Sequence, residues 1–472
     1  MSFFPDRASD VPLHRQLAGH LREAILDGEL RGGTRLHASR ALAVQLGVSR
    51  NTVTAALDQL IAEGYLEARV GAGTFVATDL TLRAPRLAAA PHALPRLAAR
   101  MQRLISVADP DRGSESALFR PGIPDVREFP EAQWRRIAHR WLDDGATRGY
   151  GDPCGYRPLR EAIASHLRQT RGVTLGAGNV IVVEGTRAAF HLVCEVLLDP
   201  GEAVALEDPG YPAARAAVSA AGGRLIPVPL DDEGFDVARA PAQARLAYVT
   251  PSHQYPTGVV MGLRRRLELL AWARGAGAYV VEDDYDAEFR YDGPPLPALQ
   301  GLDDERVLYL GTFSKTLVPG LRVAWIVVPD ALIDAFSAAR TVTSSGPSYP
   351  LQAALAAFLA DGHFALHVRR ASAIYRERRD ALVAALAREL GGAVRLQGAA
   401  TGLHLVARFD GNDVAVSQAA ANAGIIAPPL SRYTLAAHDA AGVVLGFGGG
   451  GPAAIAEGVA LLARAFASRH PH

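Results

Sequence analysis

Lysine is almost absent from this chain. Of its 49 lysine and arginine residues, 48 are arginine, and Lys315 is the only lysine. Arginine can replace lysine wherever a solvated positive charge is enough, but it stays protonated and cannot supply the neutral amine that forms a Schiff base. Lys315 is therefore a candidate for covalent chemistry. The alternative is a lysine that survived by chance on a solvated face, and residue counts alone do not separate the two interpretations.

Cysteine, net charge and long apolar runs are also scarce. Cys154 and Cys194 are too few for a disulfide framework. The formal net charge is zero with 21% charged residues, so any binding to nucleic acid or a membrane must depend on local features. The first ten residues lack the apolar run of a signal peptide, and no apolar stretch reaches transmembrane length. We therefore expect a cytoplasmic protein without a membrane partner.

The chain is nevertheless long, with 472 residues of which 49% are hydrophobic, so two or three globular units are expected. Residues 1–78 predict three short helices and a two-stranded hairpin. The first helix carries leucine and isoleucine at four-residue spacing, the second spans about Ser39 to Leu46, and Ser49 caps the third after a Gly47-Val48 turn. Strands over 65–69 and 74–77 then form a wing.

Two helices around a glycine turn, followed by a wing, are typical of a winged helix-turn-helix that places its second helix in the major groove of DNA. Arg50, Asn51 and Thr52 lie near the start of that helix, opposite its apolar stripe, and Arg40 begins the preceding helix. Eight arginines balance eight acidic residues over 1–78, so only this clustering supports DNA binding. A three-helix protein-docking module with a solvated arginine face is the alternative.

Residues 79–115 are rich in proline and alanine and predict a linker, with one helical piece over about 96–107. The remaining chain, 116–468, predicts an α/β domain. Short apolar runs alternate with helical patterns over about 170–330, which indicates a parallel or mixed sheet with helices on both faces. A smaller α+β domain follows over about 331–468, together with the segment that precedes residue 170.

Two strand ends in the larger domain carry the residues for cofactor chemistry. One buried strand runs into acidic residues, and another ends in Thr312, Ser314 and Lys315, with Arg322 seven residues later. An amine, phosphate donors and a distant carboxylate are what pyridoxal 5'-phosphate (PLP) requires. The acidic run permits two other interpretations, a Mg²⁺ site or a solvated loop, and it comprises Glu282, Asp283, Asp284, Asp286 and Glu288.

The strings RLHASRALAVQLGVSRNTV and LIAEGYLEARVGAGTFV resemble the GntR family of bacterial regulators. From about Phe119 to Ala467 the chain is similar to fold-type I PLP-dependent aminotransferases, through YGDPCGYRPLREAIA, VVEGTRAAF, LEDPGYP, VTPSHQYPTG, VEDDYDAEFRY and GTFSKTLVPGLR. A chain with both parts resembles the MocR subfamily of GntR regulators, and most of all its PLP-responsive PdxR-type members.

The resemblance implies a role for each residue of these strings. Lys315 would form the Schiff base with PLP, Asp283 would pair with the pyridine nitrogen, Tyr285 and Tyr255 would lie by the ring hydroxyl, and Tyr211 would stack on the ring. The implied phosphate site comprises Thr312, Ser314, Arg322, Gly185, Thr186 and Arg187, with Tyr150 reaching the partner subunit's phosphate in a head-to-tail homodimer. The implied contacts to double-stranded operator DNA are Arg40, Ser49, Arg50, Asn51, Thr52 and Gly71. The resemblance implies no metal site.

Three positions depart from the aminotransferase pattern. Tyr255 stands in place of an asparagine, Arg187 in place of a common glutamine, and Val444 in place of the arginine that grips a substrate carboxylate. Valine cannot make the paired hydrogen bonds that an arginine makes to a carboxylate. Arg432, which lies nearby in sequence, is a candidate to replace that arginine. Three functions stay open: a regulator that senses PLP, with vitamin B6 metabolism as one target; a regulator that senses an amino compound through an external aldimine; and an active aminotransferase. Val444 favours a sensor over an enzyme.

Overall fold

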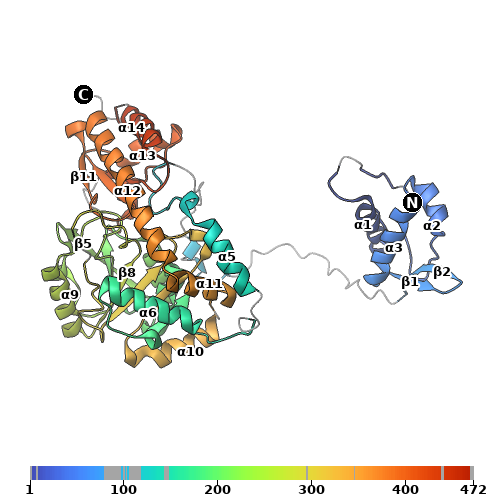
Figure 1. Cartoon of the computed structure of the whole chain (residues 1–472), viewed down its shortest axis with the longest axis horizontal. Helices are drawn as coiled ribbons and strands as arrows, with labels where there is room; N and C mark the ends of the chain where they lie inside the picture. The colour runs from blue at the N-terminus through green and yellow to red at the C-terminus, as the bar shows by residue number, and fades with distance from the viewer. Residues whose placement is uncertain are drawn as a thin grey trace. The chain divides into compact units, whose positions relative to one another are not determined.

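The computed structural model describes residues 3–6, 9–78, 97–98, 101–102, 104–105, 118–142, 148–293, 296–344, 346–436 and 441–467. The chain divides into two compact units, Met1–Arg96 and Leu97–His472 (Figure 1). The predicted linker and its helical piece lie outside the described residues, apart from three residue pairs.

The N-terminal unit is a winged helix-turn-helix. It consists of α1 (Leu13–Leu26), α2 (Ser39–Leu46), α3 (Arg50–Ala62) and an antiparallel hairpin of β1 (Leu66–Arg69) and β2 (Gly73–Val76). Gly47 ends α2 in the left-handed conformation. The apolar stripes of the three helices meet in one core, which also takes side chains from the hairpin and includes Leu17, Leu21, Leu42, Leu46, Val53, Leu57, Leu60, Leu66 and Val76.

The second unit is built on an eight-stranded mixed sheet with the order β3-β10-β9-β8-β7-β4-β5-β6. Its strands are β3 (Val180–Val183), β4 (Ala203–Asp208), β5 (Arg224–Asp231), β6 (Gly234–Phe235), β7 (Ala244–Val249), β8 (Tyr279–Asp284), β9 (Val307–Thr312) and β10 (Ala324–Val327). β9, β8, β7, β4 and β5 are mutually parallel, whereas β10 and β6 run antiparallel to their neighbours. The carboxyl ends of the parallel strands therefore meet at one edge, where ligands of such sheets bind.

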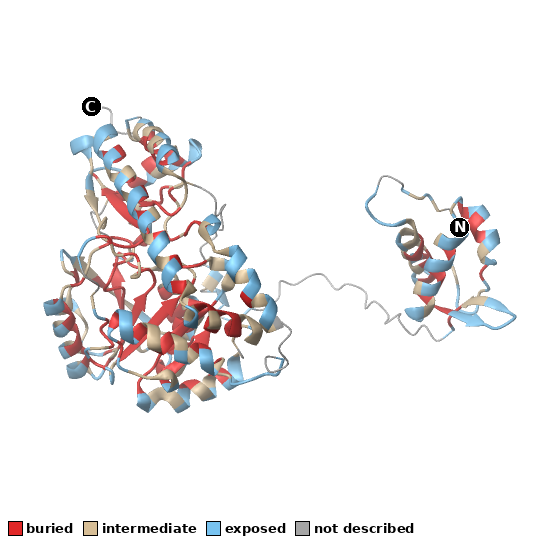
Figure 2. Cartoon of the chain, in the orientation of Figure 1, coloured by how far each residue is buried: buried red, intermediate tan, exposed pale blue. Residues whose placement is uncertain are grey.

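Helices cover both faces of this sheet, and its strands are mostly buried, apart from β5, most of whose residues are only partly buried (Figure 2). Because side chains alternate along a strand, Val180 and Val182 of β3 pack toward one set of helices while Ile181 and Val183 pack toward the other. The first set is α5 (Glu131–Leu142), α6 (Arg157–Arg171) and α11 (Tyr349–Ala360), and the second is α7 (Thr186–Leu197), α8 (Pro212–Ala221) and α10 (Ile333–Thr343). A further helix, α9 (Leu263–Ala276), packs on β4, β7 and β8.

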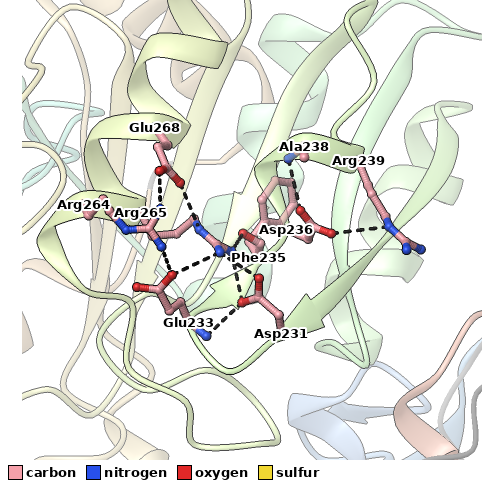
Figure 3. A network of polar contacts seen from close by, with 9 residues as sticks. All are labelled: Asp231, Glu233, Phe235, Asp236, Ala238, Arg239, Arg264, Arg265 and Glu268. Atoms are coloured by element: carbon pink, nitrogen blue, oxygen red, sulfur yellow. Dashed lines mark hydrogen bonds and ion pairs between the residues drawn. The ribbon is translucent and has the colours of Figure 1, made fainter.

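One polar network fastens α9 to the β5–β6 hairpin (Figure 3). Arg265 is 7% exposed and donates to Asp231 at 2.7 Å and to the carbonyl of Phe235 at 2.7 Å. Its neighbour Arg264 pairs with Glu233 and Glu268 on the exposed side of the same helix. The two arginines therefore bind the same hairpin from a buried and an exposed position.

The smaller domain contains an antiparallel sheet in the order β11-β12-β13, from β11 (Arg395–Gln397), β12 (His404–Arg408) and β13 (Gly442–Gly446). Helices α13 (Asp413–Asn422) and α14 (Pro452–Ala467) and the long α12 (His363–Glu389) pack with it around a second core. α12 joins the domains, since Phe364 packs in the large-domain core and Leu382 in the small one.

Helices α10 and α11 follow residue 331, where the smaller domain was predicted to begin, but they pack on the large sheet. Within the described part of the chain, no single helix has the length and apolar composition to cross a membrane. Only α11 and α12 taken together, with a 74° bend between them, meet that test.

Candidate functional site

Lys315 lies just past the carboxyl end of β9 and is partly buried. Its Nζ donates a 2.6 Å hydrogen bond to the carbonyl of Gly122. Burial lowers the pKa of the Lys315 amine, and the positive charges of Arg187 and Arg322 lower it further, against the opposing effect of Asp286 and Asp283. Deprotonation to the nucleophilic amine is therefore easier for Lys315 than for an ordinary lysine.

Asp283 is buried on β8, beside the strand that leads to Lys315. Burial raises the pKa of this carboxyl to about 7, although a hydrogen bond from the Tyr248 hydroxyl to Oδ2 works against that rise. The other oxygen, Oδ1, is buried and has no hydrogen-bond partner in the structure. A buried acceptor without a partner carries a desolvation cost that a bound donor would relieve.

The acidic run around Asp283 does not converge on one point. Glu282 and Asp284 project to the opposite side of β8 from Asp283, because side chains alternate along a strand. There Arg266 lies 3.7 Å from Glu282 and Arg171 lies 2.7 Å from Asp284. These carboxyls are buried and paired with arginines, which rules against both a solvated acidic loop and a Mg²⁺ site formed by the whole run.

A cradle of polar groups is formed by the start of α7 and the segment that contains Lys315. Gly185 immediately precedes α7, and Thr186 is the first residue of that helix, so backbone N–H groups and the positive end of the helix dipole are available to an anion. Gly185 has a φ of +133°, and a Cβ there would lie 3.0 Å from Nη2 of Arg322. Thr312 Oγ1 accepts from the backbone N–H of Ser314 at 3.0 Å. The predicted phosphate ligands therefore belong to two segments that meet near Gly185.

Aromatic residues form the wall beside this cradle. Tyr211 and Tyr255 meet edge to face with ring centroids 5.6 Å apart, and Tyr255 meets Tyr285 in the same way at 6.0 Å. Arg187 Nε lies 3.5 Å from the Tyr211 hydroxyl. The Tyr285 hydroxyl donates to the carbonyl of His253 at 2.9 Å. These contacts bring four predicted site residues together.

Tyr150 is different, because it is 95% exposed and takes no place in this buried group of its own chain. Val444 is fully buried and packs with Val406, Leu430 and Tyr433. Arg432 is exposed and lies in a surface groove with residues of α13. The structure thus places apolar packing at Val444 and a cation at the surface at Arg432.

Sequence reasoning did not find four residues of this region: Gly122, Tyr248, His253 and Tyr433. Gly122 touches Lys315 from a segment almost two hundred residues away, and no local pattern predicts such a contact. In the sequence, Tyr248 is indistinguishable from the other apolar residues of a buried strand. His253 lies in the string VTPSHQYPTG and Tyr433 next to Arg432, and the imidazole of the one and the hydroxyl of the other were the available signals.

The predicted DNA-binding residues belong to α2, to the cap and first turn of α3, and to the turn of the wing. Arg40, Arg50, Asn51 and Gly71 are exposed and Thr52 is half-buried. Ser49 caps α3, and its Oγ accepts from the backbone N–H of Thr52 at 3.1 Å. The cap therefore satisfies a backbone N–H at the start of α3, while the side chains of Arg50 and Asn51 are exposed.

Comparison with known proteins agrees with both units. Residues 13–76 match the family of bacterial regulatory proteins of the gntR type, and residues 125–443 match aminotransferase class I and II. The chain is 40% identical to a probable rhizopine catabolism regulatory protein, MocR, of Rhizobium meliloti over 98% of this chain and 95% of the relative. It is 32% identical to the pyridoxine biosynthesis transcriptional regulator PdxR of Corynebacterium glutamicum over 94% of this chain and 93% of that one.

Among solved structures, the multiple substrate aminotransferase of Thermococcus profundus superposes with a TM-score of 0.70 at 27% identity, over 79% of this chain and 96% of that one. The likeness covers the second unit and establishes the fold-type I architecture there. The N-terminal unit and its helix-turn-helix are shared with the full-length regulators. The chain therefore belongs to the MocR subfamily of GntR transcriptional regulators, which joins a winged helix-turn-helix to an aminotransferase-like domain.

Proposed function

We propose that the aminotransferase-like domain binds PLP at Lys315 and that the occupancy of this site sets the affinity of the winged helix-turn-helix for operator DNA. The observation that carries the proposal is Asp283. Its Oδ1 is buried without a hydrogen-bond partner, on the strand next to the one that leads to Lys315. A pyridinium N–H is a donor that suits this atom.

The other residues of the site fit the same ligand. Bound PLP supplies an aldehyde that condenses with a primary amine and a ring that withdraws electrons. Lys315 provides the amine, and its lowered pKa keeps that amine available. Arg322, Thr312, Ser314 and the N-terminus of α7 would hold the phosphate dianion. Tyr211 and Tyr255 would pack against the ring and limit its orientation.

The site supports a sensor better than an enzyme. Val444 is enclosed by apolar side chains, so this wall offers no cation to the carboxylate of an amino acid. Arg432, the alternative cation, is exposed beside α13. Transamination of an ordinary α-amino acid requires such an anchor for orientation, and its loss leaves the cofactor itself as the recognised ligand. The similarity to a regulator of pyridoxine biosynthesis makes vitamin B6 metabolism a reasonable target.

A second candidate is a sensor of an amino compound that condenses with bound PLP. The similarity to a regulator of rhizopine catabolism favours this reading, because that function concerns a catabolic substrate rather than the cofactor. Since the wall at Val444 is apolar, such an effector would not depend on a carboxylate. The two candidates differ in what changes DNA affinity: PLP alone, or an amine added to the PLP-bound protein.

The deciding experiment measures operator affinity by fluorescence anisotropy for wild type and for Lys315→Ala, each with and without PLP. We expect PLP to shift the affinity of wild type only. Equal affinities with and without PLP, in protein whose absorbance shows bound PLP, would contradict PLP sensing. A shift that occurs only when a panel of amines is added would select the second candidate. A matched control is Arg264→Ala, an exposed substitution on α9.

A further inference from the structure

Three chemically suited side chains gather where the large and small domains meet. His253 follows β7, Asp286 follows β8, and His404 is the first residue of β12 in the small domain. Their exposed fractions are 1%, 1% and 0%. One nitrogen or oxygen of each lies within 4.8 Å of the others. The group brings two imidazoles and one carboxylate together away from solvent.

The hydrogen bonds around these three side chains leave atoms that could still bind a metal ion. His253 Nδ1 lies 3.1 Å from each carboxylate oxygen of Asp286, so neither oxygen is favoured as its hydrogen-bond acceptor. His404 Nε2 lies 3.0 Å from the carbonyl of Pro256 and donates to it. This fixes the tautomer and leaves the lone pair on Nδ1, an atom that is buried without a hydrogen-bond partner.

His404 and Asp286 make the kinds of hydrogen bond that commonly support metal ligands. A ligating histidine commonly donates its other N–H to a backbone carbonyl, as His404 does, and a ligating carboxylate is commonly hydrogen-bonded, as Asp286 is by the N–H of Leu403 at 3.1 Å. Because Nε2 of His404 donates to the Pro256 carbonyl, the lone pair on Nδ1 is available to a metal ion. Gly402 makes room for the ring, since a Cβ there would lie 2.0 Å from His253 Nδ1.

The geometry points to a divalent-metal site at His253, Asp286 and His404, which binds Zn²⁺ or a similar transition-metal ion through two imidazoles and one carboxylate. This donor set suits borderline ions rather than Mg²⁺ or Ca²⁺, which prefer oxygen ligands only. His404 would coordinate through Nδ1, with a carboxylate oxygen of Asp286 and a ring nitrogen of His253 as the other two ligands. The Tyr285 hydroxyl lies beside this group, 3.1 Å from His253 Nδ1.

Such an ion would link the domains. His253 and Asp286 belong to loops of the large sheet, whereas His404 belongs to the small sheet. The site would therefore fix the small domain beside Tyr285 and Asp283. Its existence does not depend on PLP, and its test can be made on protein without PLP.

The test is metal content and cobalt binding of the full chain without an affinity tag. The protein is stripped with a chelator, incubated with Zn²⁺, desalted and analysed by elemental mass spectrometry. We expect one Zn²⁺ per chain, and we expect Co²⁺ to give the visible absorption of a low-symmetry, four- or five-coordinate ion. Zn²⁺ should also raise the melting temperature of the second unit, because an ion that binds only the folded state stabilises it.

Two variants distinguish this site from the remaining histidines. His404→Gln keeps an amide N–H for the Pro256 carbonyl but loses the imidazole nitrogen, so it should lose the bound ion while it stays folded. His191→Gln removes an exposed histidine of α7 and should keep one ion per chain. Wild type that takes up no Zn²⁺ or Co²⁺, or His404→Gln that binds as much as wild type, would overturn the proposal. Should His404→Gln fail to fold, the cobalt spectrum of wild type decides alone.

Discussion

Glu207, near the end of β4, is a buried carboxyl that is held by neutral hydrogen-bond donors. Glu207, at 3% exposure, accepts hydrogen bonds from Thr250 Oγ1 at 2.7 Å and Gln254 Nε2 at 3.0 Å, yet no arginine contacts it in the described structure. Burial raises the pKa of Glu207 to about 7, with hydrogen bonds from Thr250 and Gln254 opposing the rise. Neutral donors thus hold a carboxyl that stays protonated at mildly acidic pH.

This shift predicts how stability depends on pH. Glu207 titrates near pH 4.5 in the unfolded chain and near pH 7 in the folded chain, so between these values the folded state binds more protons. Stability therefore falls as the pH rises through this window, by up to about 1.4 kcal/mol per pH unit for one such group. In Glu207→Gln, the decline between pH 5 and pH 7 should be shallower by an amount of that order.

Urea unfolding followed by tryptophan fluorescence measures this decline, because all four tryptophans belong to the second unit. Glu195→Gln, an exposed change on α7, is the control and should retain the slope of wild type. An unchanged slope in Glu207→Gln would show that Glu207 is ionised in the folded protein across this range.

At the scale of single elements, α3 combines a capped N-terminus with an exposed polar face. If Arg50 reads a base, Arg50→Ala should weaken operator binding by roughly 1–3 kcal/mol and relax the sequence preference at one position. Arg31→Ala, an exposed arginine of the same unit outside the helix-turn-helix, serves as the charge-matched control. Binding assays at two salt concentrations separate base reading from a phosphate contact, since losing a phosphate contact changes the salt dependence equally for all sequences.

The network in Figure 3 gives a second prediction at this scale. Arg265→Ala removes a buried guanidinium that binds Asp231 and the Phe235 carbonyl, and hydrogen bonds to charged groups are worth about 1.5–3 kcal/mol each. We expect the second unit to lose stability on that order. Arg264→Ala, on the exposed side of the same helix, should cost less than about 0.5 kcal/mol. If urea unfolding shows equal losses of unfolding free energy in the two variants, burial of Arg265 does not add to its contribution to stability.

The sequence predicted the elements best where one pattern dominated. The predicted second helix, Ser39 to Leu46, matches α2, which ends before Gly47 in the left-handed conformation. β5 shows no such pattern, since Pro227 and Pro229 interrupt the alternation and most of its residues are only partly buried. The acidic end of β8 stays within the sheet, where Glu282 and Asp284 pair with arginines from α9 and α6, and no local pattern reveals these pairs.

At the scale of the whole molecule, motif strings predicted the residues near Lys315 but not the contacts among them. Tyr248, Gly122 and His404 reach this region from three distant segments, and only the assembled sheet shows that they meet. Tyr150 is 95% exposed, and the family resemblance predicts that it reaches the phosphate site of a partner subunit.

This arrangement predicts complementation between defective subunits. If two chains form a head-to-tail dimer and each site takes Tyr150 from the other chain, Tyr150→Phe and Lys315→Ala damage different halves of one site. A heterodimer of the two variants then contains one site with Lys315 from the first chain and Tyr150 from the second, both intact. Co-expression with two different tags, tandem purification and PLP titration should show one tight site per heterodimer, whereas neither homodimer has any. If Tyr150 acts only within its own chain, the heterodimer has no intact site, and tight PLP binding stays absent.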